Sequence, residues 1–230
     1  MGIFEKIATV IAPDCCIVCG EEGSAICHWC WPDAFEKIPS TCFRCKSLTD
    51  NFMVCKKCKR NTGLSNVWIG SGYNKTMKKL ITGLKYERRI DYHRFLVSRI
   101  DEKAPYFDDF IVSWVPTTTS RKRQRGFDQA EKIAKRFAKL RNLPSVSLLC
   151  RIDQEQQVGK SKEERLVSKI EFVPKRVLNG ERVLLVDDVI TTGTTLSRAA
   201  KCLKQAGAKE ISALVCATNY RSGTTKDKLV

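Results

Sequence analysis

Apolar residues follow two different periodicities along residues 66–220 of the chain. Short continuous apolar runs predict strands at residues 67–70, 110–115, 146–150, 182–186 and 211–217. Between these runs, apolar positions three and four residues apart predict amphipathic helices at residues 74–89, 127–140 and 196–205. Strands that alternate with helices predict an α/β domain in which helices cover both faces of a parallel sheet.

The first sixty residues break this pattern, because they are poor in apolar side chains and rich in cysteine. Eight of the 12 cysteines in the chain form Cys-x-x-Cys pairs there, namely Cys16/Cys19, Cys27/Cys30, Cys42/Cys45 and Cys55/Cys58. A gap of two residues lets both thiolates turn toward one tetrahedral zinc ion. We therefore predict a small double zinc ribbon at residues 1–60 that depends on its metal for folding. A linker at 61–65, the α/β domain at 66–220 and a tail at 221–230 would follow.

Eight thiolates fill two four-cysteine zinc sites, which would be structural because no ligand position is left for water. In the simplest arrangement the first four cysteines bind one ion and the last four bind the other, while an interleaved pairing satisfies the same spacing. The alternative to zinc is a disulfide framework, which needs an oxidising compartment. Residues 7–13 form only a short apolar stretch after the acidic Glu5. We therefore expect no signal peptide and a cytoplasmic location.

Basic residues exceed acidic ones along most of the chain, whose net charge is +16. Residues 1–60 contribute only +1 and the remaining residues contribute +15. The densest segment is 121–141, which holds 9 basic and 2 acidic side chains. Such a field favours polyanions such as nucleic acid, phosphorylated metabolites or anionic lipid. Charge alone fits a basic surface without a partner equally well.

The segment most informative about chemistry is 183–195, with the sequence VLLVDDVITTGTT. An apolar strand is followed by two adjacent carboxylates, a turn rich in threonine and glycine, and then a helix. In an open α/β sheet, ligands bind at the carboxyl ends of strands, and a helix N-terminus attracts anions. The hydroxyl groups suit a phosphate, whereas the two acids suit sugar hydroxyls or a divalent cation. The pattern therefore predicts a site for a sugar phosphate, and it lacks the lysine of a nucleotide-binding P-loop.

Paired acids followed by TTGTT resemble the 5-phosphoribosyl-1-diphosphate (PRPP) signature of type I phosphoribosyltransferases. With its cysteine-rich start, the chain resembles the ComF competence-protein family, in which a double zinc ribbon precedes such a domain. Further matching stretches lie at residues 73–86, 115–116, 125–131 and 151–165. The resemblance implies a type I phosphoribosyltransferase-like fold over nearly the whole chain.

The resemblance also implies a role for individual residues. Asp187 and Asp188 would hold the ribose hydroxyls of PRPP, directly or through Mg²⁺. The PRPP 5-phosphate would lie in the loop formed by Thr191, Thr192, Gly193, Thr194 and Thr195. The pyrophosphate would lie at Thr117, Thr118 and Thr119, followed by the basic DNA-binding candidates Arg121, Lys122, Arg123 and Arg125. Residues 152–168 would be a mobile hood, and the candidate catalytic residues are Asp187, Asp188, Lys160 and Arg165.

Three functions are compatible with these residues. The first is a phosphoribosyltransferase that releases pyrophosphate from PRPP to an acceptor that the sequence does not identify. The second is a non-catalytic PRPP sensor whose partner is single-stranded DNA or another competence protein, since the ComF resemblance implies DNA uptake during natural transformation. The third is an adaptor that binds proteins through its zinc ribbon. The near-neutral charge of residues 1–60 argues against the ribbon itself as the main DNA-binding surface.

Overall fold

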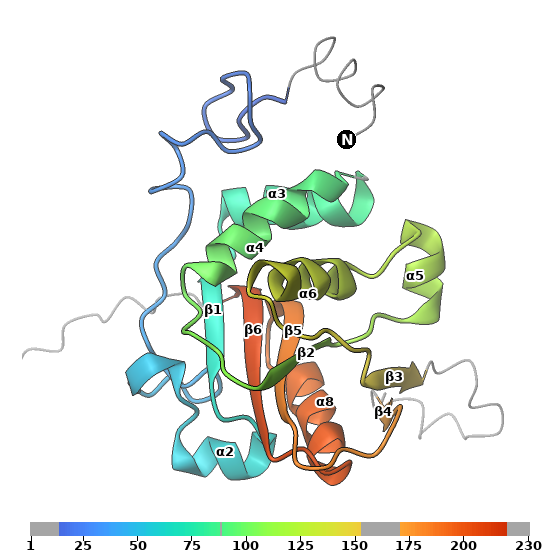
Figure 1. Cartoon of the computed structure of the whole chain (residues 1–230). Coiled ribbons are helices and arrows are strands. Elements are labelled where there is room, and N and C mark those ends of the chain that lie inside the picture. Colours follow the sequence, from blue (N-terminus) through green and yellow to red (C-terminus); the bar gives the residue numbers. More distant parts are fainter. Residues whose placement is uncertain (1–13, 88, 153–170, 220–230) are drawn as a thin grey trace, which may run out of the picture.

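The computed structural model describes residues 14–87, 89–152 and 171–219. Within them, four parallel strands form a sheet in the order β1-β6-β5-β2 (Figure 1). These strands are β1 (Val67–Gly72), β2 (Phe110–Trp114), β5 (Arg182–Ile190) and β6 (Glu210–Thr218). The predicted α/β architecture is therefore confirmed, with a parallel sheet between helical layers.

Alternating side chains of the central strands fill two separate cores, because successive residues of a strand point to opposite faces. In β5, Leu184 and Val186 belong to the core beneath α3 (Lys75–Tyr86), α4 (His93–Asp101) and α6 (Gln129–Leu140). Val183 and Leu185 belong to the opposite core, which α8 (Thr194–Gln205) and α2 (Lys56–Thr62) cover. Burial on both faces explains why these strands are continuous apolar runs.

Two predicted strands differ from the observed ones. Residues 146–150 were expected in the parallel sheet, but β3 (Leu149–Ile152) pairs antiparallel with β4 (Glu171–Pro174) in a separate two-stranded sheet. Next to β2 the chain makes one isolated parallel bridge, from Val112 to Ser145, and the N–H of Val146 donates to the Val112 carbonyl at 2.9 Å. An apolar run reports burial and does not specify the partner strand, which is why the sequence misplaced it.

The second difference concerns β5, which was expected to end before the paired acids. It continues to Ile190, because its backbone pairing with β6 extends through Val189 opposite Ala217. Ladder hydrogen bonds depend on the backbone alone, so a polar side chain does not terminate a strand. Asp187 and Asp188 therefore lie inside a strand, where the backbone fixes their directions.

The cysteine-rich segment packs on both faces of the sheet and along its edge. Phe35 is buried in the core of α3 and α4, whereas Phe43 is buried in the core of α8. Between them the chain passes the edge strand β1, where the Gly72 N–H donates to the carbonyl of Glu36 at 3.3 Å. This contact covers part of an otherwise open sheet edge.

The expected linker is also packed rather than free. Residues 61 and 62 complete α2, and the side chains of Thr62 and Leu64 have no exposed surface. Further elements are η1 (Asp50–Phe52), η2 (Ile90–Tyr92) and α5 (Thr119–Arg125). These three, together with α2, α4 and β4, were not anticipated from the sequence. The predicted tail at 221–230 lies outside the described residues. Among the helices that are described, none combines the length and apolar character needed to cross a membrane.

Candidate functional site

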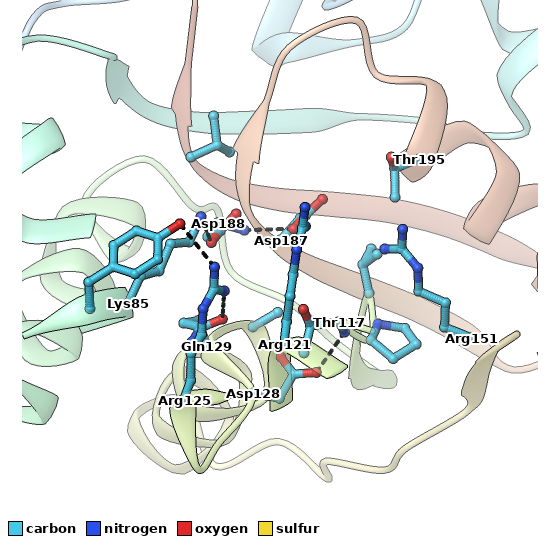
Figure 2. Close-up of a pocket in the computed structure, with 15 residues that line it drawn as sticks. Lys85, Thr117, Arg121, Arg125, Asp128, Gln129, Arg151, Asp187, Asp188 and Thr195 are labelled. Carbon is cyan, nitrogen blue, oxygen red and sulfur yellow. Dashed lines mark hydrogen bonds and ion pairs between the residues drawn. The ribbon is translucent and has the colours of Figure 1, made fainter. Parts of the chain in front are cut away.

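A polar pocket of about 250 Å³ opens at the carboxyl ends of β2 and β5. Its walls come from the end of α3, the segment after β2, the starts of α6 and α8, and β3. The charged residues that line it are Lys85, Arg121, Arg125, Asp128, Arg151, Asp187 and Asp188. Figure 2 shows the labelled side chains turned toward this common space.

The paired acids of β5 form one wall of the pocket and differ in their surroundings. The carboxylate of Asp188 forms an ion pair with the ammonium group of Lys85, whose Nζ lies 2.5 Å from Oδ2. Asp187 accepts a hydrogen bond from the backbone N–H of Asp188 at 2.8 Å. Burial, with the negative charge of Asp188 beside it, raises the pKa of Asp187 to about 8. Asp187 therefore holds a proton at neutral pH until a ligand or cation changes its environment.

The expected phosphate loop lies between β5 and α8 and begins the helix. Gly193 precedes α8 with a left-handed φ of 73°, and its carbonyl accepts a hydrogen bond from the Ser197 hydroxyl at 2.7 Å. The hydroxyls of Thr192 and Thr194 lie 2.9 Å apart. Thr195 lines the pocket, whereas Thr191, Thr192 and Thr194 are exposed beside it and Gly193 is buried. The helix start supplies the backbone N–H groups that an anion prefers.

The expected pyrophosphate loop begins directly after β2, and one of its three threonines lines the pocket. The backbone N–H of Thr117 donates to the carboxylate of Asp128 at 2.8 Å. Thr118 instead caps α5 by accepting from the Arg121 N–H at 3.3 Å, and Thr119 begins that helix. Burial raises the pKa of Asp128, while the Thr117 N–H opposes this shift. Asp128 thus fixes the loop and caps α6 through the Glu131 N–H.

The basic residues expected beyond this loop separate into two groups. Arg121 and Arg125 line the pocket. Lys122 and Arg123 are exposed on α5 outside it, and Lys122 lies 3.8 Å from Glu131. Lys160 and Arg165, the expected cations of the hood, lie outside the described residues.

Several pocket residues had no assigned role in the sequence prediction. Arg125 connects two of them, because its guanidinium donates to Gln129 at 2.8 Å and to the hydroxyl of Tyr86 at 3.1 Å. Gln129 is buried, and its amide nitrogen has no hydrogen-bond partner among the described residues. Lys85 and Arg151 complete the pocket from distant parts of the chain (Figure 2). Their stretches match the family pattern, but the sequence carries no information on their distance from the acids.

The combined chemistry suits a ligand that carries both phosphates and hydroxyls. Four cationic side chains face the space, and the acids lie together on one strand. The N-terminus of α8 and the Thr117 loop supply two separate regions for anions. The carboxylates of Asp187 and Asp188 are the oxygen donors that Mg²⁺ prefers, so the donor set fits that cation.

The eight paired cysteines form two groups of four, and their arrangement in space is the sequential one and not the interleaved one. Among the described residues, the sulfurs of Cys16, Cys19, Cys27 and Cys30 lie within 4.8 Å of one another, as do those of Cys42, Cys45, Cys55 and Cys58. The first group packs beside the core of α3 and α4, and the second beside the core of α8. Both groups are compatible with a double zinc ribbon.

Two of these thiols have a lowered pKa, which favours the thiolate form that binds zinc. Burial opposes ionisation of Cys16, but hydrogen bonds from the backbone of Cys19 and Cys27 lower its pKa to about 6. Hydrogen bonds from the hydroxyl and backbone of Ser47 lower the pKa of Cys45 to about 6. Each group therefore has a thiolate near neutral pH, and four sulfur donors in this arrangement fit tetrahedral zinc.

Comparisons with known proteins find relatives of this chain. A family model described as "Phosphoribosyl transferase domain" matches residues 123–230. The competence protein ComFC of Streptococcus pneumoniae is 26% identical over 212 residues, which cover 90% of this chain and 94% of that protein. ComFC of Bacillus subtilis is 32% identical over 139 residues, or 59% of this chain and 56% of its own. A hypoxanthine/guanine phosphoribosyltransferase of Methanococcus voltae is 30% identical over 155 residues, or 61% of this chain and 78% of its own.

Proposed function

Because this chain belongs to the phosphoribosyltransferase family and is homologous to the ComFC competence proteins, we propose that it binds PRPP with Mg²⁺ in the polar pocket. One observation carries this proposal. The acid pair, the start of α8 and the Thr117 loop converge on a single space of about 250 Å³ that cationic side chains surround. A ligand with a pentose between a phosphate and a diphosphate matches that order of groups.

In this proposal each group of residues acts on a different part of PRPP. Asp187 and Asp188 hold the ribose hydroxyls, and the 191–195 loop with the α8 N-terminus holds the 5-phosphate. Arg121 and the backbone at Thr117 face the diphosphate. Bound Mg²⁺ would neutralise part of the diphosphate charge. The reaction class is displacement at the anomeric carbon, in which the bond to pyrophosphate breaks as a bond to the acceptor forms.

Titration with PRPP in the presence of Mg²⁺ tests this assignment. We expect saturable binding at one site, and weaker binding of ribose 5-phosphate or pyrophosphate, because each fills only one of the two anion regions. Calorimetry with the three ligands measures this order. Pyrophosphate release, screened over bases and amines, then separates an enzyme from a PRPP sensor. Absence of PRPP binding would contradict the proposed function in both forms.

We further propose that the protein acts in DNA uptake and that exposed residues of α5 bind the backbone of single-stranded DNA. Lys122 and Arg123 are exposed on this helix, outside the pocket, in the most basic segment of the chain. Cytoplasmic handling of incoming DNA suits a protein whose cysteines must stay reduced to bind zinc.

Charge reversal tests this DNA surface with a matched control. The pair Lys122→Glu and Arg123→Glu is expected to weaken DNA binding about tenfold at low salt and to reduce the salt slope by about 1–2. The pair Lys56→Glu and Lys57→Glu makes the same charge change on exposed positions of α2 and should have a smaller effect. Fluorescence anisotropy across a salt series measures both. Equal effects of the two pairs would show that net charge, and not α5, governs binding.

A further inference from the structure

The loop that begins α8 is held from outside by an aromatic ring of the cysteine-rich segment. Gly193 has a φ of 73°, and a Cβ placed on it would lie 2.4 Å from Cε2 of Phe43. The same Cβ would lie 3.3 Å from Cδ1 of Ile190, so ring and isoleucine close around the glycine backbone. Phe43 is only 5% exposed. The ring therefore occupies the space that any other residue at 193 would need.

Phe43 is placed by the turn that carries two cysteines of the second group. It directly follows Cys42 and precedes Cys45 by two residues, and both sulfurs belong to that group. The turn is closed by the Cys42 N–H donating to the Ser47 carbonyl at 2.8 Å, and by the Lys46 ammonium donating to the Phe43 carbonyl at 2.8 Å. This segment lies in neither a helix nor a strand. Its shape therefore depends on these contacts and on whatever joins the four sulfurs.

The start of α8 needs such support, because its left-handed residue could adopt other conformations. A glycine populates positive and negative φ about equally, so it does not fix its own backbone. Gly193 is the N-cap residue of α8 and has no side chain that could cap the helix. The Thr192 and Ser197 hydroxyls supply local hydrogen bonds, and the Phe43 ring supplies the packing from the opposite side.

We propose that Phe43 is a positioning residue for the 5-phosphate loop, and that the second cysteine group thereby sets the affinity for the phosphorylated ligand. The inference rests on the proposed function, because it assumes that residues 191–195 bind the phosphate. The sulfurs of Cys42, Cys45, Cys55 and Cys58 would hold a metal ion that fixes the turn. The turn places the Phe43 ring, and the ring keeps Gly193 in its left-handed conformation. The first cysteine group packs beside the core on the opposite face of the sheet.

Phe43→Ala tests the contact between ring and loop. If the loop then keeps its binding conformation in about one tenth of the molecules, the apparent Kd for PRPP rises about tenfold. Phe43→Leu refills much of the space and should recover most of the affinity. Phe35→Ala is the matched control, because it removes a buried ring of the same segment from the other core. Calorimetric titration with PRPP and Mg²⁺, beside thermal unfolding of each variant, separates a loss of affinity from a loss of stability.

A second pair of variants tests the connection to metal. Cys45→Ser and Cys19→Ser each remove one exposed sulfur, from the second and the first group respectively. We expect Cys45→Ser to weaken PRPP binding about tenfold and Cys19→Ser to leave it within a factor of about two. Metal content, measured on the same samples, should fall by one ion in each variant.

The outcomes separate this inference from the proposed function. If the unaltered protein does not bind PRPP, the proposed function is wrong and the inference falls with it. If the unaltered protein binds PRPP and Phe43→Ala binds it equally well, only the inference is overturned. Equal losses for Phe43→Ala and Phe35→Ala, or for the two cysteine variants, would likewise overturn it, because they would indicate general destabilisation.

Discussion

Asp187→Asn is expected to stabilise the folded protein at neutral pH while it abolishes PRPP binding. The pKa of Asp187 is raised from 3.8 to about 8, first by burial and then by the charge of Asp188. Between these two values the folded protein holds a proton that the unfolded chain has released. Stability therefore falls as pH rises through this window. An asparagine has no proton to lose, so the variant avoids this penalty.

We expect the gain to be about 2 kcal/mol in the free energy of unfolding at pH 7. It should shrink as the pH falls and vanish below about pH 3, where the aspartate is protonated in both states. The affinity for PRPP should drop at least about 100-fold, because a carboxylate that faces the ribose is lost. Urea unfolding at several pH values, with a PRPP titration at pH 7, measures both effects.

Asp188→Asn provides the comparison on the neighbouring residue. Asp188 is paired with Lys85 at 2.5 Å, so its removal leaves an ammonium without that partner. This variant should lose PRPP binding without the gain in stability. If the free energy of unfolding of both variants changed with pH in the same way, Asp187 and Asp188 would not differ as their surroundings indicate. Retained PRPP binding by Asp187→Asn would refute the role of that carboxylate.

The sequence could predict the residues of the site that are adjacent in the chain, but not those that are distant in it. The paired acids and the loop of threonines are contiguous, so one stretch of sequence contains both their chemistry and their proximity. Lys85 and Arg151 reach the same pocket from α3 and β3, and no local pattern records that they do. Pairing of Lys85 with Asp188 is a property of the assembled sheet and the helix above it.

For the fold, the sequence predicted the central strands but not their full extents or their partners. Runs such as residues 182–186 are apolar because β5 is buried on both faces, so the pattern indicates each central strand. Its observed extension to Ile190 follows from pairing with β6, which side-chain polarity does not reveal. Residues 146–150 show the opposite error. Their apolar run indicated a buried strand but not its partner strand, so the prediction assigned them to the wrong sheet.

The cysteine-rich segment was predicted as a separate module, but the structure integrates it into both cores. Ala25, Ile26 and Phe35 contribute to one core, and Ile38, Phe43 and Val54 contribute to the other. Apolar residues that are sparse in the sequence are thus buried by surfaces of the α/β domain. Folding of this segment and stability of the sheet are consequently coupled through these contacts.

Removal of metal is therefore expected to destabilise the whole protein and not the segment alone. We expect two zinc ions per chain, one for each group of four sulfurs. Structural zinc binds zinc-finger peptides with an apparent free energy of about 10–16 kcal/mol, most of which is folding free energy. Without zinc, the four sulfurs of each group would lose the ion that holds them together. Unfolding of the cysteine-rich segment would expose core residues such as Phe35 and Phe43.

Chelation should lower the Tm by about 10 °C or more, since each 1 kcal/mol corresponds to about 2–4 °C for a chain of this size. Elemental analysis before chelation and a thermal scan after it measure the stoichiometry and the shift. Cys202→Ser is the control, because this buried thiol lies in α8 outside both groups and should leave two ions bound. One ion per chain would contradict two independent sites. An unchanged Tm after complete removal would show that packing against the two cores suffices to hold the cysteine-rich segment.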